Sequence, residues 1–270
     1  MAGRVHGRLA LVTGAGSGIG AASAIALASE GATVIVTDIR EDAAHAVAQR
    51  IVAAGARATS WALDVASEDD WRNAVRRARA ELGPITILHS NAALTSKEAY
   101  HGDLGVVDLS MDLFDAVIAV NLKGAVLGCK HVIPAMIDAG GGSVILTSSV
   151  KASTGSAYRT AYSVSKGGIE SLTRVVATGY GKSGVRCNAI APGIVATDAT
   201  APLPDKQREA LRAAHLTPEL GTADDIANAV VYLASNEAKF VTGQVLFVDG
   251  GLASHTEALS PQGSRTNLID

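Results

Sequence analysis

The stretch TGAGSGIG, residues 13–20, stands between the apolar segment LALVT at 9–13 and a helical pattern at 18–30. Glycines in a turn from a strand into a helix let the backbone approach a diphosphate closely and let the helix pack tightly on the strand. The N-terminus of such a helix adds free N–H donors and a partial positive charge. The stretch therefore predicts a strand–turn–helix unit that binds the diphosphate of a dinucleotide, although the same glycines could form a tight turn without a ligand.

Short apolar segments rich in β-branched residues alternate with helical patterns along the chain. The expected strands cover residues 9–13, 33–38, 57–64, 85–90, 143–148, 185–192 and 244–249. The expected helices cover residues 18–30, 41–54, 67–82, 111–139, 157–182 and 223–234. Continuously apolar strands indicate burial on both faces. We therefore predict an α/β fold of the Rossmann type, with about seven strands in a doubly wound parallel sheet and helices on both faces.

No linker long or polar enough to divide the 270 residues interrupts this alternation, so we expect residues 1–270 to form a single dinucleotide-binding catalytic domain. Two segments fall outside the pattern. Residues 198–216, which contain two prolines and a short helical pattern, are expected to form a substrate lid. Residues 252–270 are polar and are expected to form a C-terminal tail.

Several functional classes are disfavoured by composition. The net charge of -3 and the pI of about 6.2 give no basic face for nucleic acid. No run of about 18 apolar residues predicts a membrane span, no signal peptide is evident, and the histidines show no metal-ligand spacing. Cys129 and Cys187 lie in apolar segments and are expected to be buried free thiols. These features favour a cytoplasmic protein without a catalytic metal.

Asp38 ends the second expected strand, about 20 residues beyond the glycine-rich turn. A carboxylate at that place can bind the hydroxyls of the adenosine ribose and repels a 2′-phosphate, which favours NAD over NADP. The same side chain could cap the helix that starts near Glu41. Arg40 instead favours NADP, because its guanidinium could reach a 2′-phosphate.

Tyr162 and Lys166 are four residues apart in the stretch AYSVSK at 161–166. On a helix this spacing puts both side chains on one face. The pKa of a free phenol is about 10, and a neighbouring ammonium lowers it toward the range in which general acid–base catalysis is efficient. An isolated pair of this kind is more often a surface pair without function, so its interpretation depends on the other motifs.

Those motifs occur in a fixed order. They are TGAGSGIG at 13–20, Asp64-Val65, Asn91-Ala92, Asn121, Ser149, Tyr162-x-x-x-Lys166 and Pro192-Gly193. In this order and spacing the chain closely resembles the short-chain dehydrogenase/reductase family from about residue 8 to residue 251.

The resemblance implies a catalytic role for four residues. Tyr162 would act as the general acid–base on the substrate oxygen. Lys166 would lower the pKa of Tyr162 and bind the nicotinamide ribose. Ser149, thirteen residues before Tyr162, would hold the substrate oxygen in preference to its neighbour Ser148. Asn121 would hold a water molecule in a proton relay with Lys166.

The resemblance also implies a set of cofactor-binding residues, in which Asp64 and Val65 contact the adenine, Asn91 steadies the sheet beside the cofactor, and Ile194 and Thr197 contact the nicotinamide carboxamide. The full set is Gly14, Ser17, Gly18, Ile19, Gly20, Asp38, Asp64, Val65, Asn91, Ala92, Tyr162, Lys166, Pro192, Gly193, Ile194 and Thr197. One departure concerns Ala93, where the family usually has glycine. If that glycine had a positive φ, alanine would cost about 1 kcal/mol and require a small backbone adjustment.

The expected substrate pocket is mostly small and apolar, which favours a neutral secondary alcohol or its ketone. Its walls are Leu94, Ser149, Val150, Tyr158 and Gly193, with Ala152 and the 198–216 lid. Lys151 or Arg159 could instead steer a carboxylate or phosphate. Members of the resembled family commonly form homotetramers through the helices expected at 111–139 and 157–182 and the last strand.

We therefore expect an NAD-dependent oxidoreductase acting on CH–OH groups, with Asp38 as the residue that favours NAD. Two alternatives stay open at this point. One is a carbonyl or 3-oxoacyl-carrier-protein reductase that uses NADPH. The other is a non-catalytic, nucleotide-sensing protein on the same fold, against which the intact Ser149, Tyr162 and Lys166 argue.

Overall fold

The computed structural model describes residues 3–196 and 205–255. The expected contact of Thr197, the first part of the expected lid and residues 256–270 of the expected tail lie outside the described residues.

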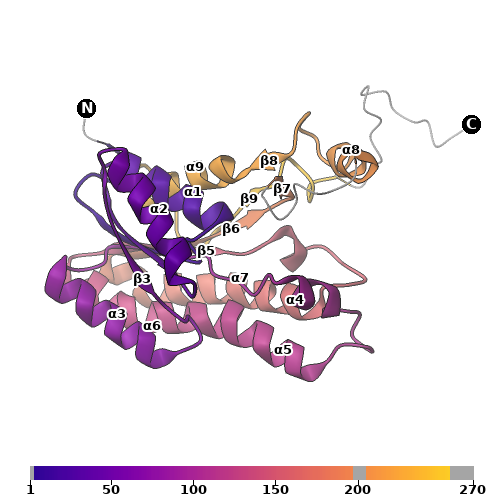
Figure 1. Cartoon of the computed structure of the whole chain (residues 1–270), viewed down its shortest axis with the longest axis horizontal. Coiled ribbons are helices and arrows are strands. Elements are labelled where there is room, and N and C mark those ends of the chain that lie inside the picture. The colour runs from indigo at the N-terminus through magenta and orange to yellow at the C-terminus, as the bar shows by residue number, and fades with distance from the viewer. Residues whose placement is uncertain (1–2, 197–204, 256–270) are drawn as a thin grey trace, which may run out of the picture.

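A seven-stranded parallel sheet forms the centre of the molecule, in the order β3-β2-β1-β4-β5-β6-β9 (Figure 1). Its strands are β1 (Leu9–Thr13), β2 (Thr33–Asp38), β3 (Arg57–Ala62), β4 (Ile87–Ser90), β5 (Gly142–Thr147), β6 (Val185–Pro192) and β9 (Val245–Val248). The predicted doubly wound α/β fold with about seven strands is confirmed.

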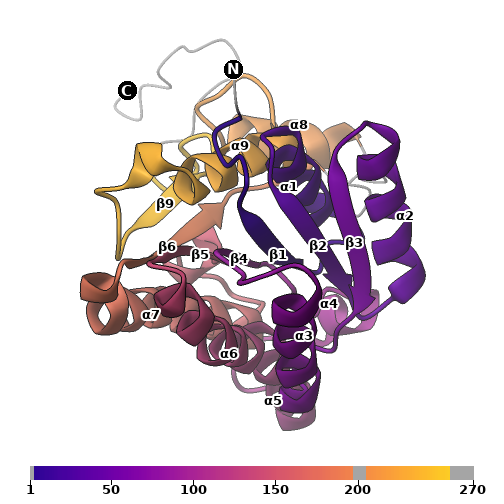
Figure 2. The same ribbon diagram turned by 90° about the vertical axis from the view of Figure 1, so that its left-hand side faces the viewer.

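Helices cover both faces of this sheet, as Figures 1 and 2 show. One face carries α1 (Gly18–Ser29), α2 (Glu41–Ala53) and α9 (Ala223–Ala234). The other carries α3 (Glu68–Glu81), α6 (Gly124–Asp138) and α7 (Thr160–Tyr180). Three further helices are α4 (Lys97–Gly102), α5 (Met111–Ile118) and α8 (Asp205–Ala213).

Successive residues of the strands fill two separate cores. Ala10 and Val12 of β1 pack with α1, α2 and α9, whereas Leu9 and Leu11 pack on the opposite face with α3, α6 and α7. Neighbouring side chains of a strand point to opposite faces, so a strand that is apolar at every position buries both sides. The unbroken apolar runs in the sequence have this cause.

The chain order reverses between β1 and β4. From β1 the sheet grows through β2 and β3 in one direction and through β4, β5, β6 and β9 in the other. A crevice forms outside the carboxyl ends of the strands at such a switch point and is the usual ligand site of open α/β sheets.

Two predicted helices differ in detail from the structure: the one at 111–139 has the predicted extent but an irregular turn, and the one at 157–182 starts later. The helix predicted at 111–139 consists of α5 and α6, joined by a π-helical turn at Ala119–Lys123. The helix predicted from residue 157 begins at Thr160, because Arg159 has a left-handed backbone conformation and ends the preceding loop. The sequence pattern also missed α4 and a small parallel pair, β7 (Val195–Ala196) with β8 (Gly221–Thr222).

The run Met111–Asp138 is long and apolar enough to cross a membrane, but half of its most apolar stretch is buried inside the fold. Its α6 part packs on β4 and β5 and beside α3, and this packing accounts for its hydropathy. Cys129 on α6 and Cys187 on β6 are free and buried, as predicted.

Candidate active site

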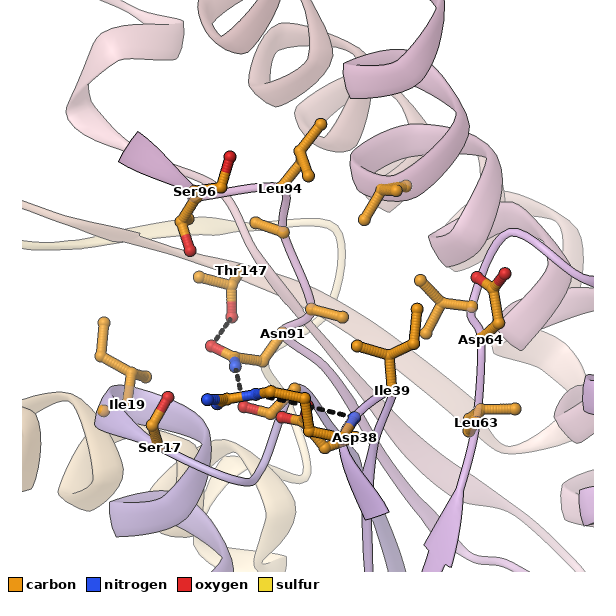
Figure 3. A pocket seen from close by; sticks show the side chains of 18 of the residues that line it. Ser17, Ile19, Asp38, Ile39, Leu63, Asp64, Asn91, Leu94, Ser96 and Thr147 are labelled. Atoms are coloured by element: carbon orange, nitrogen blue, oxygen red, sulfur yellow. Dashed lines mark hydrogen bonds and ion pairs between the residues drawn. The ribbon is translucent and has the colours of Figure 1, made fainter. Parts of the chain in front are cut away.

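A cleft of about 670 Å³ opens at the carboxyl ends of β1, β2 and β4, at the switch point of the sheet. Figure 3 shows Ser17 and Ile19 on one side of it, Leu63 and Asp64 on the other, and Asp38 between them. Its lining residues are Gly14, Ser17, Gly18, Ile19, Asp38, Ile39, Arg40, Leu63, Asp64, Val65, Asn91, Ala92, Ala93, Leu94, Thr95, Ser96, Val120, Thr147, Tyr162 and Lys166. Eleven of these belong to the predicted cofactor set.

Two positions in the turn after β1 require glycine. Gly14 has a φ of +61°, and a Cβ there would lie 2.8 Å from the Cα of Ala92. A Cβ on Gly20 would run into the carbonyl oxygen of Gly14 and lie 2.7 Å from Nδ2 of Asn91. The turn after β1 and the segment after β4 therefore pack backbone against backbone.

The N-terminus of α1 suits an anionic ligand. Ser17, its N-cap residue, makes no side-chain cap, and no acidic residue lies in the first turn. The first N–H groups of a helix have no partner within the helix, and their partial positive charge favours a phosphate. The free N–H groups at the start of α1, next to the glycine-rich turn, thus fit the diphosphate of a nicotinamide dinucleotide.

Asp38 is fixed on the wall of the cleft, at the end of β2. Its Oδ2 accepts a hydrogen bond from the N–H of Gly16 at 3.0 Å, and its Oδ1 accepts one from the N–H of Arg40 at 3.0 Å. The Nε of Arg40 lies 3.6 Å from Oδ1, and the Arg40 side chain is 60% exposed. The carboxylate therefore stands in one orientation, with one flexible cation beside it.

Asn91 joins the ends of β1, β4 and β5. Its N–H donates to Oγ1 of Thr13, and its side-chain amide donates to the carbonyl oxygens of Thr13 and Gly14. Thr147 Oγ1 donates to Oδ1 of Asn91 at 3.3 Å (Figure 3). The same Oγ1 lies 3.0 Å from Nε2 of the fully buried His89. Burial lowers the pKa of His89 to about 3, so this ring is neutral at physiological pH.

Ser149 and Tyr162 meet beside the cleft, which Tyr162 helps to line. Ser149 is buried and shares a side-chain hydrogen bond with the Tyr162 phenol. Ser148 instead contacts the carbonyl oxygen of Lys166 and Oε1 of Glu170, on the far side of the strand end. Ser149 is thus the serine oriented toward Tyr162.

Lys166 lies one helical turn after Tyr162 and is 2% exposed. Its Nζ donates to the carbonyl oxygen of Thr147 at 2.7 Å and lies 5.5 Å from the centroid of the Tyr162 ring. Burial, with a smaller contribution from the charge of Arg159, lowers the pKa of Lys166 to about 8.

The sequence predicts that Lys166 lowers the pKa of Tyr162, but Lys166 is not among the groups that shift this pKa in the structure. Burial raises the pKa of the Tyr162 phenol, and the hydrogen bond with Ser149 and the charge of Arg159 offset part of that rise. Lys166 is directed to Thr147 instead, so the largest nearby positive influence on the phenol is Arg159.

Asn121 lies in the π-helical turn between α5 and α6. Its Oδ1 accepts from the N–H of Leu94 at 2.8 Å, and its Nδ2 donates to Oγ of Ser165 at 3.1 Å. These bonds tie α7 to the cleft segment after β4. π-helical turns are rare in proteins, and those that do occur are often found at functional sites.

Not all predicted site residues line the cleft. Val150 is buried in a short 3₁₀ turn at Val150–Ala152, and the side chain of Tyr158 is 66% exposed. Gly193 packs against Asp249, so that a Cβ added to Gly193 would lie 2.7 Å from the Cα of Asp249. The further predicted residues outside the lining are Gly20, Asn121, Ser149, Pro192 and Ile194.

Ala93 has no positive φ, because Arg159 is the one non-glycine residue with a positive φ in the part of the chain that the structure describes. The expected strain at Ala93 is therefore absent. Sequence reasoning missed other residues that line the cleft, among them Thr147, Val120 and Ser96. Their only signal was position, at strand ends or beside Asn121. The described residues hold no group of three or more His, Cys, Asp or Glu side chains that could bind a metal ion.

Substitution of Gly20 by alanine is expected to weaken both the fold and cofactor binding. The added methyl has to displace the Gly14 carbonyl or the Asn91 amide, so we expect a loss of about 1–3 kcal/mol in the free energy of unfolding. The Kd for NADH, measured by fluorescence titration, should rise at least about tenfold.

Gly179 in α7 provides the matched control, because a Cβ there meets nothing within 4 Å. Gly179→Ala should leave the Kd unchanged and stabilise the helix slightly. Equal behaviour of the two variants would contradict the packing role of Gly20.

Known proteins match this chain over most of its length. The family model described as Enoyl-(Acyl carrier protein) reductase matches residues 14–253. A probable short-chain type dehydrogenase/reductase of Bradyrhizobium diazoefficiens is 36% identical over 266 residues, which cover 97% of this chain and 93% of the relative. The cis-4-hydroxycyclohexanecarboxylate dehydrogenase of Sinomonas cyclohexanicum is 39% identical over 244 residues, which cover 90% of this chain and 96% of the relative.

Solved structures share the fold almost end to end. A gluconate 5-dehydrogenase from Burkholderia cenocepacia J2315, in complex with NADP and tartrate, matches with a TM-score of 0.87 at 31% identity, over 94% of this chain and 98% of that chain. A 7α-hydroxysteroid dehydrogenase, complexed with NADH and 7-oxo glycochenodeoxycholic acid, matches with a TM-score of 0.85 at 34% identity, over 92% of this chain and 95% of that chain. One of these structures thus holds NADP and the other NADH.

Proposed function

Because the chain belongs to the short-chain dehydrogenase/reductase family of oxidoreductases, we propose that it transfers a hydride between a secondary alcohol, or its ketone, and NAD(H). The observation that carries the proposal is that Tyr162 and Lys166 both line the cleft and that Ser149 contacts the Tyr162 phenol. A nucleotide-sensing protein would have no use for this acid–base group. The names of two relatives, which act on a hydroxycyclohexanecarboxylate and a hydroxysteroid, favour a cyclic secondary alcohol.

In the proposed reaction Tyr162 handles the proton. During oxidation its phenolate oxygen takes the proton from the alcohol oxygen, and during reduction its phenol gives that proton to the carbonyl oxygen. Ser149, already in contact with the phenol, donates a second hydrogen bond to the reacting oxygen and holds it in place. The nicotinamide, when bound, accepts the hydride that leaves the carbinol carbon.

Lys166 is proposed to bind the nicotinamide ribose. Its ammonium faces the Thr147 carbonyl, which borders the cleft. Ribose hydroxyls in the cleft would offer it further acceptors. Asn121, which binds Leu94 and Ser165 through its side chain, would hold the water molecule of the relay.

NAD is the proposed cofactor because Asp38 holds a fixed negative charge where a 2′-phosphate would lie. A carbonyl or 3-oxoacyl-carrier-protein reductase using NADPH is the second candidate. Arg40 favours it, since this exposed cation lies on the cleft wall beside Asp38. The description of the matching family model also names an acyl-carrier-protein reductase.

A cytoplasmic homotetramer is part of the proposal. Its support is that α7 and β9, two of the elements expected at the subunit contacts, expose large apolar side chains. These are Val164 and Val175 on α7 and Leu246 and Phe247 on β9. Size-exclusion chromatography with light scattering would measure the assembly directly.

Alcohol oxidation is expected to accelerate as the pH rises. Burial raises the pKa of Tyr162, so the phenol is protonated at neutral pH, and the deprotonated fraction grows about tenfold per pH unit below that pKa. The value of kcat/KM for oxidation should follow this fraction, and that for ketone reduction should stay level until the phenol loses its proton. Both are measured from the absorbance of the reduced nicotinamide. A flat oxidation profile, together with a primary deuterium isotope effect that shows hydride transfer to be rate-limiting, would contradict Tyr162 as the base.

A further inference from the structure

Arg159 stands at the N-terminal end of α7, one helical turn before Tyr162. Its backbone is left-handed, with a φ of 68°, which costs a non-glycine residue about 1–2 kcal/mol. Such strain persists only where the surroundings fix it. The N–H of Arg159 donates to the carbonyl oxygen of Asp103 at 2.8 Å, and its own carbonyl accepts the N–H of Ser163 at 2.8 Å. The chain thus holds this side chain in place at an energetic cost.

The guanidinium lies against two aromatic rings. Its Cζ is 4.4 Å from the ring centroid of Tyr162 and 4.5 Å from that of Tyr100 on α4. The segment that runs into α4 includes Ala93 to Ser96, which line the cleft. Arg159 is therefore next to the proposed acid–base group.

The charge of Arg159 is only partly neutralised. Its Nε is buried without a hydrogen-bond partner, and its guanidinium makes no hydrogen bond to any residue that the structure describes. Asp103 Oδ2 is 3.9 Å from Nε, but the two oxygens of this carboxylate already accept the N–H groups of Ala161 and Tyr162 at 2.9 and 3.0 Å. An arginine normally satisfies its five N–H donors, and a buried one left without a partner is costly.

Lys151, the other cation that the sequence offered for steering an anion, is placed differently. Its Nζ donates to Oγ of Ser156 in an exposed loop contact. Arg159, by contrast, has a side chain that is 18% exposed. Between the two, only Arg159 combines burial, unused donors and contact with Tyr162.

We infer that Arg159 binds a carboxylate of the substrate, so that the enzyme acts on a hydroxy acid or the corresponding oxo acid. This inference rests on the proposed oxidoreductase function. With rings against the guanidinium, its in-plane N–H groups remain for a ligand, and a coplanar carboxylate accepts two of them at once. A small ring or short carbon chain would link that carboxylate to the hydroxyl at Tyr162. The neutral substrate favoured by the sequence is thereby revised to an acid.

The test compares acids with their own amides. The probes are 3- and 4-hydroxycyclohexanecarboxylate and 4-hydroxypentanoate, each against its carboxamide, with NAD and NADP. We expect kcat/KM of the wild type to favour the acid about 30-fold or more in at least one pair, the effect of a charged hydrogen-bonded pair. Arg159→Gln should reduce this preference to within about threefold, whatever loss the two substrates share. Arg159→Lys should retain part of it, and Lys151→Gln all of it.

A binding measurement tests the carboxylate site of Arg159 without turnover. Cyclohexanecarboxylate, which has no hydroxyl to oxidise, should bind the wild type with NADH at least about 30-fold more tightly than it binds Arg159→Gln, by calorimetry. Cyclohexanecarboxamide should show no such difference. Thermal unfolding of each variant confirms that it is folded.

The outcomes separate the two claims. Equal use of acids and amides by the wild type, or equal losses for both in Arg159→Gln, would overturn the carboxylate site and leave a structural role for Arg159. Turnover of neutral cyclohexanol without turnover of any acid would overturn it as well. Failure of every alcohol with both cofactors would overturn the proposed function itself.

Discussion

Replacement of Tyr162 by phenylalanine is expected to lower kcat for alcohol oxidation by about 10³-fold or more. The substitution removes the phenol oxygen that exchanges the proton and shares a hydrogen bond with Ser149. The ring remains and keeps its contacts with Arg159 and Lys166. The Kd for NADH should therefore change by no more than about threefold, which separates lost chemistry from lost binding.

Tyr180 supplies the control for this substitution. It is the last residue of α7 and is partly exposed, 18 residues after Tyr162 on the same helix. Tyr180→Phe removes the same oxygen and should keep wild-type turnover. If Tyr162→Phe retained more than about a tenth of the wild-type kcat, the proton would have to pass through another group.

Substitution of Asp38 by asparagine is expected to lower the preference for NAD over NADP, as a ratio of kcat/KM values, by about 100-fold or more. The amide keeps the shape of the side chain and an oxygen for the N–H of Gly16, but removes the charge that repels a 2′-phosphate. It would also weaken the proposed charge-assisted bond to the ribose hydroxyls, and such bonds are worth about 1.5–3 kcal/mol. Paired steady-state kinetics with the two cofactors measure the ratio.

Arg40 makes this test sharper. If its exposed guanidinium binds the 2′-phosphate, Asp38→Asn should gain NADP activity that the double variant with Arg40→Ala loses. Arg40→Ala alone should leave NAD kinetics nearly unchanged. A wild type that prefers NADP, with Arg40→Ala abolishing that preference, would reverse the assignment and favour the NADPH-dependent reductase.

The architecture could be predicted because the sequence shows the apolar patterns of both buried strands and helices. Strands such as β1 and β2 are apolar at successive positions, which only a sheet covered on both faces requires. The glycines at 14 and 20 marked the turn into α1, since a side chain at either place would meet the neighbouring backbone. The cleft at the switch point follows from the parallel order alone.

The sequence could not predict where backbone irregularities fall. The helix that contains Asn121 looks continuous by periodicity, yet five residues form a π-helical turn there. The start of α7 at Thr160 was also unpredictable, because it depends on a contact with a distant residue. Asp103, far away in the sequence, accepts the N–H groups of Ala161 and Tyr162 and so acts as a cap that local composition does not show.

Electrostatic coupling was the least predictable part of the site. The i, i+4 spacing rightly placed Lys166 beside Tyr162 on one helix face, but not the Thr147 carbonyl that takes its ammonium. It gave no sign that Arg159 would lie against the ring of Tyr162. Such contacts depend on χ angles and on loops that pack from elsewhere in the fold.

Hydride transfer itself is the most direct measurement of the central claim. Cyclic secondary alcohols, with and without a carboxylate and deuterated at the carbinol carbon, are incubated with NAD and the wild-type enzyme, and the reduced cofactor is examined by mass spectrometry and NMR. Our account predicts that deuterium from at least one of them appears at C4 of the nicotinamide, and that Tyr162→Phe forms almost none of this product. Cofactor that binds but is never reduced, or that is reduced without deuterium at C4, would contradict it.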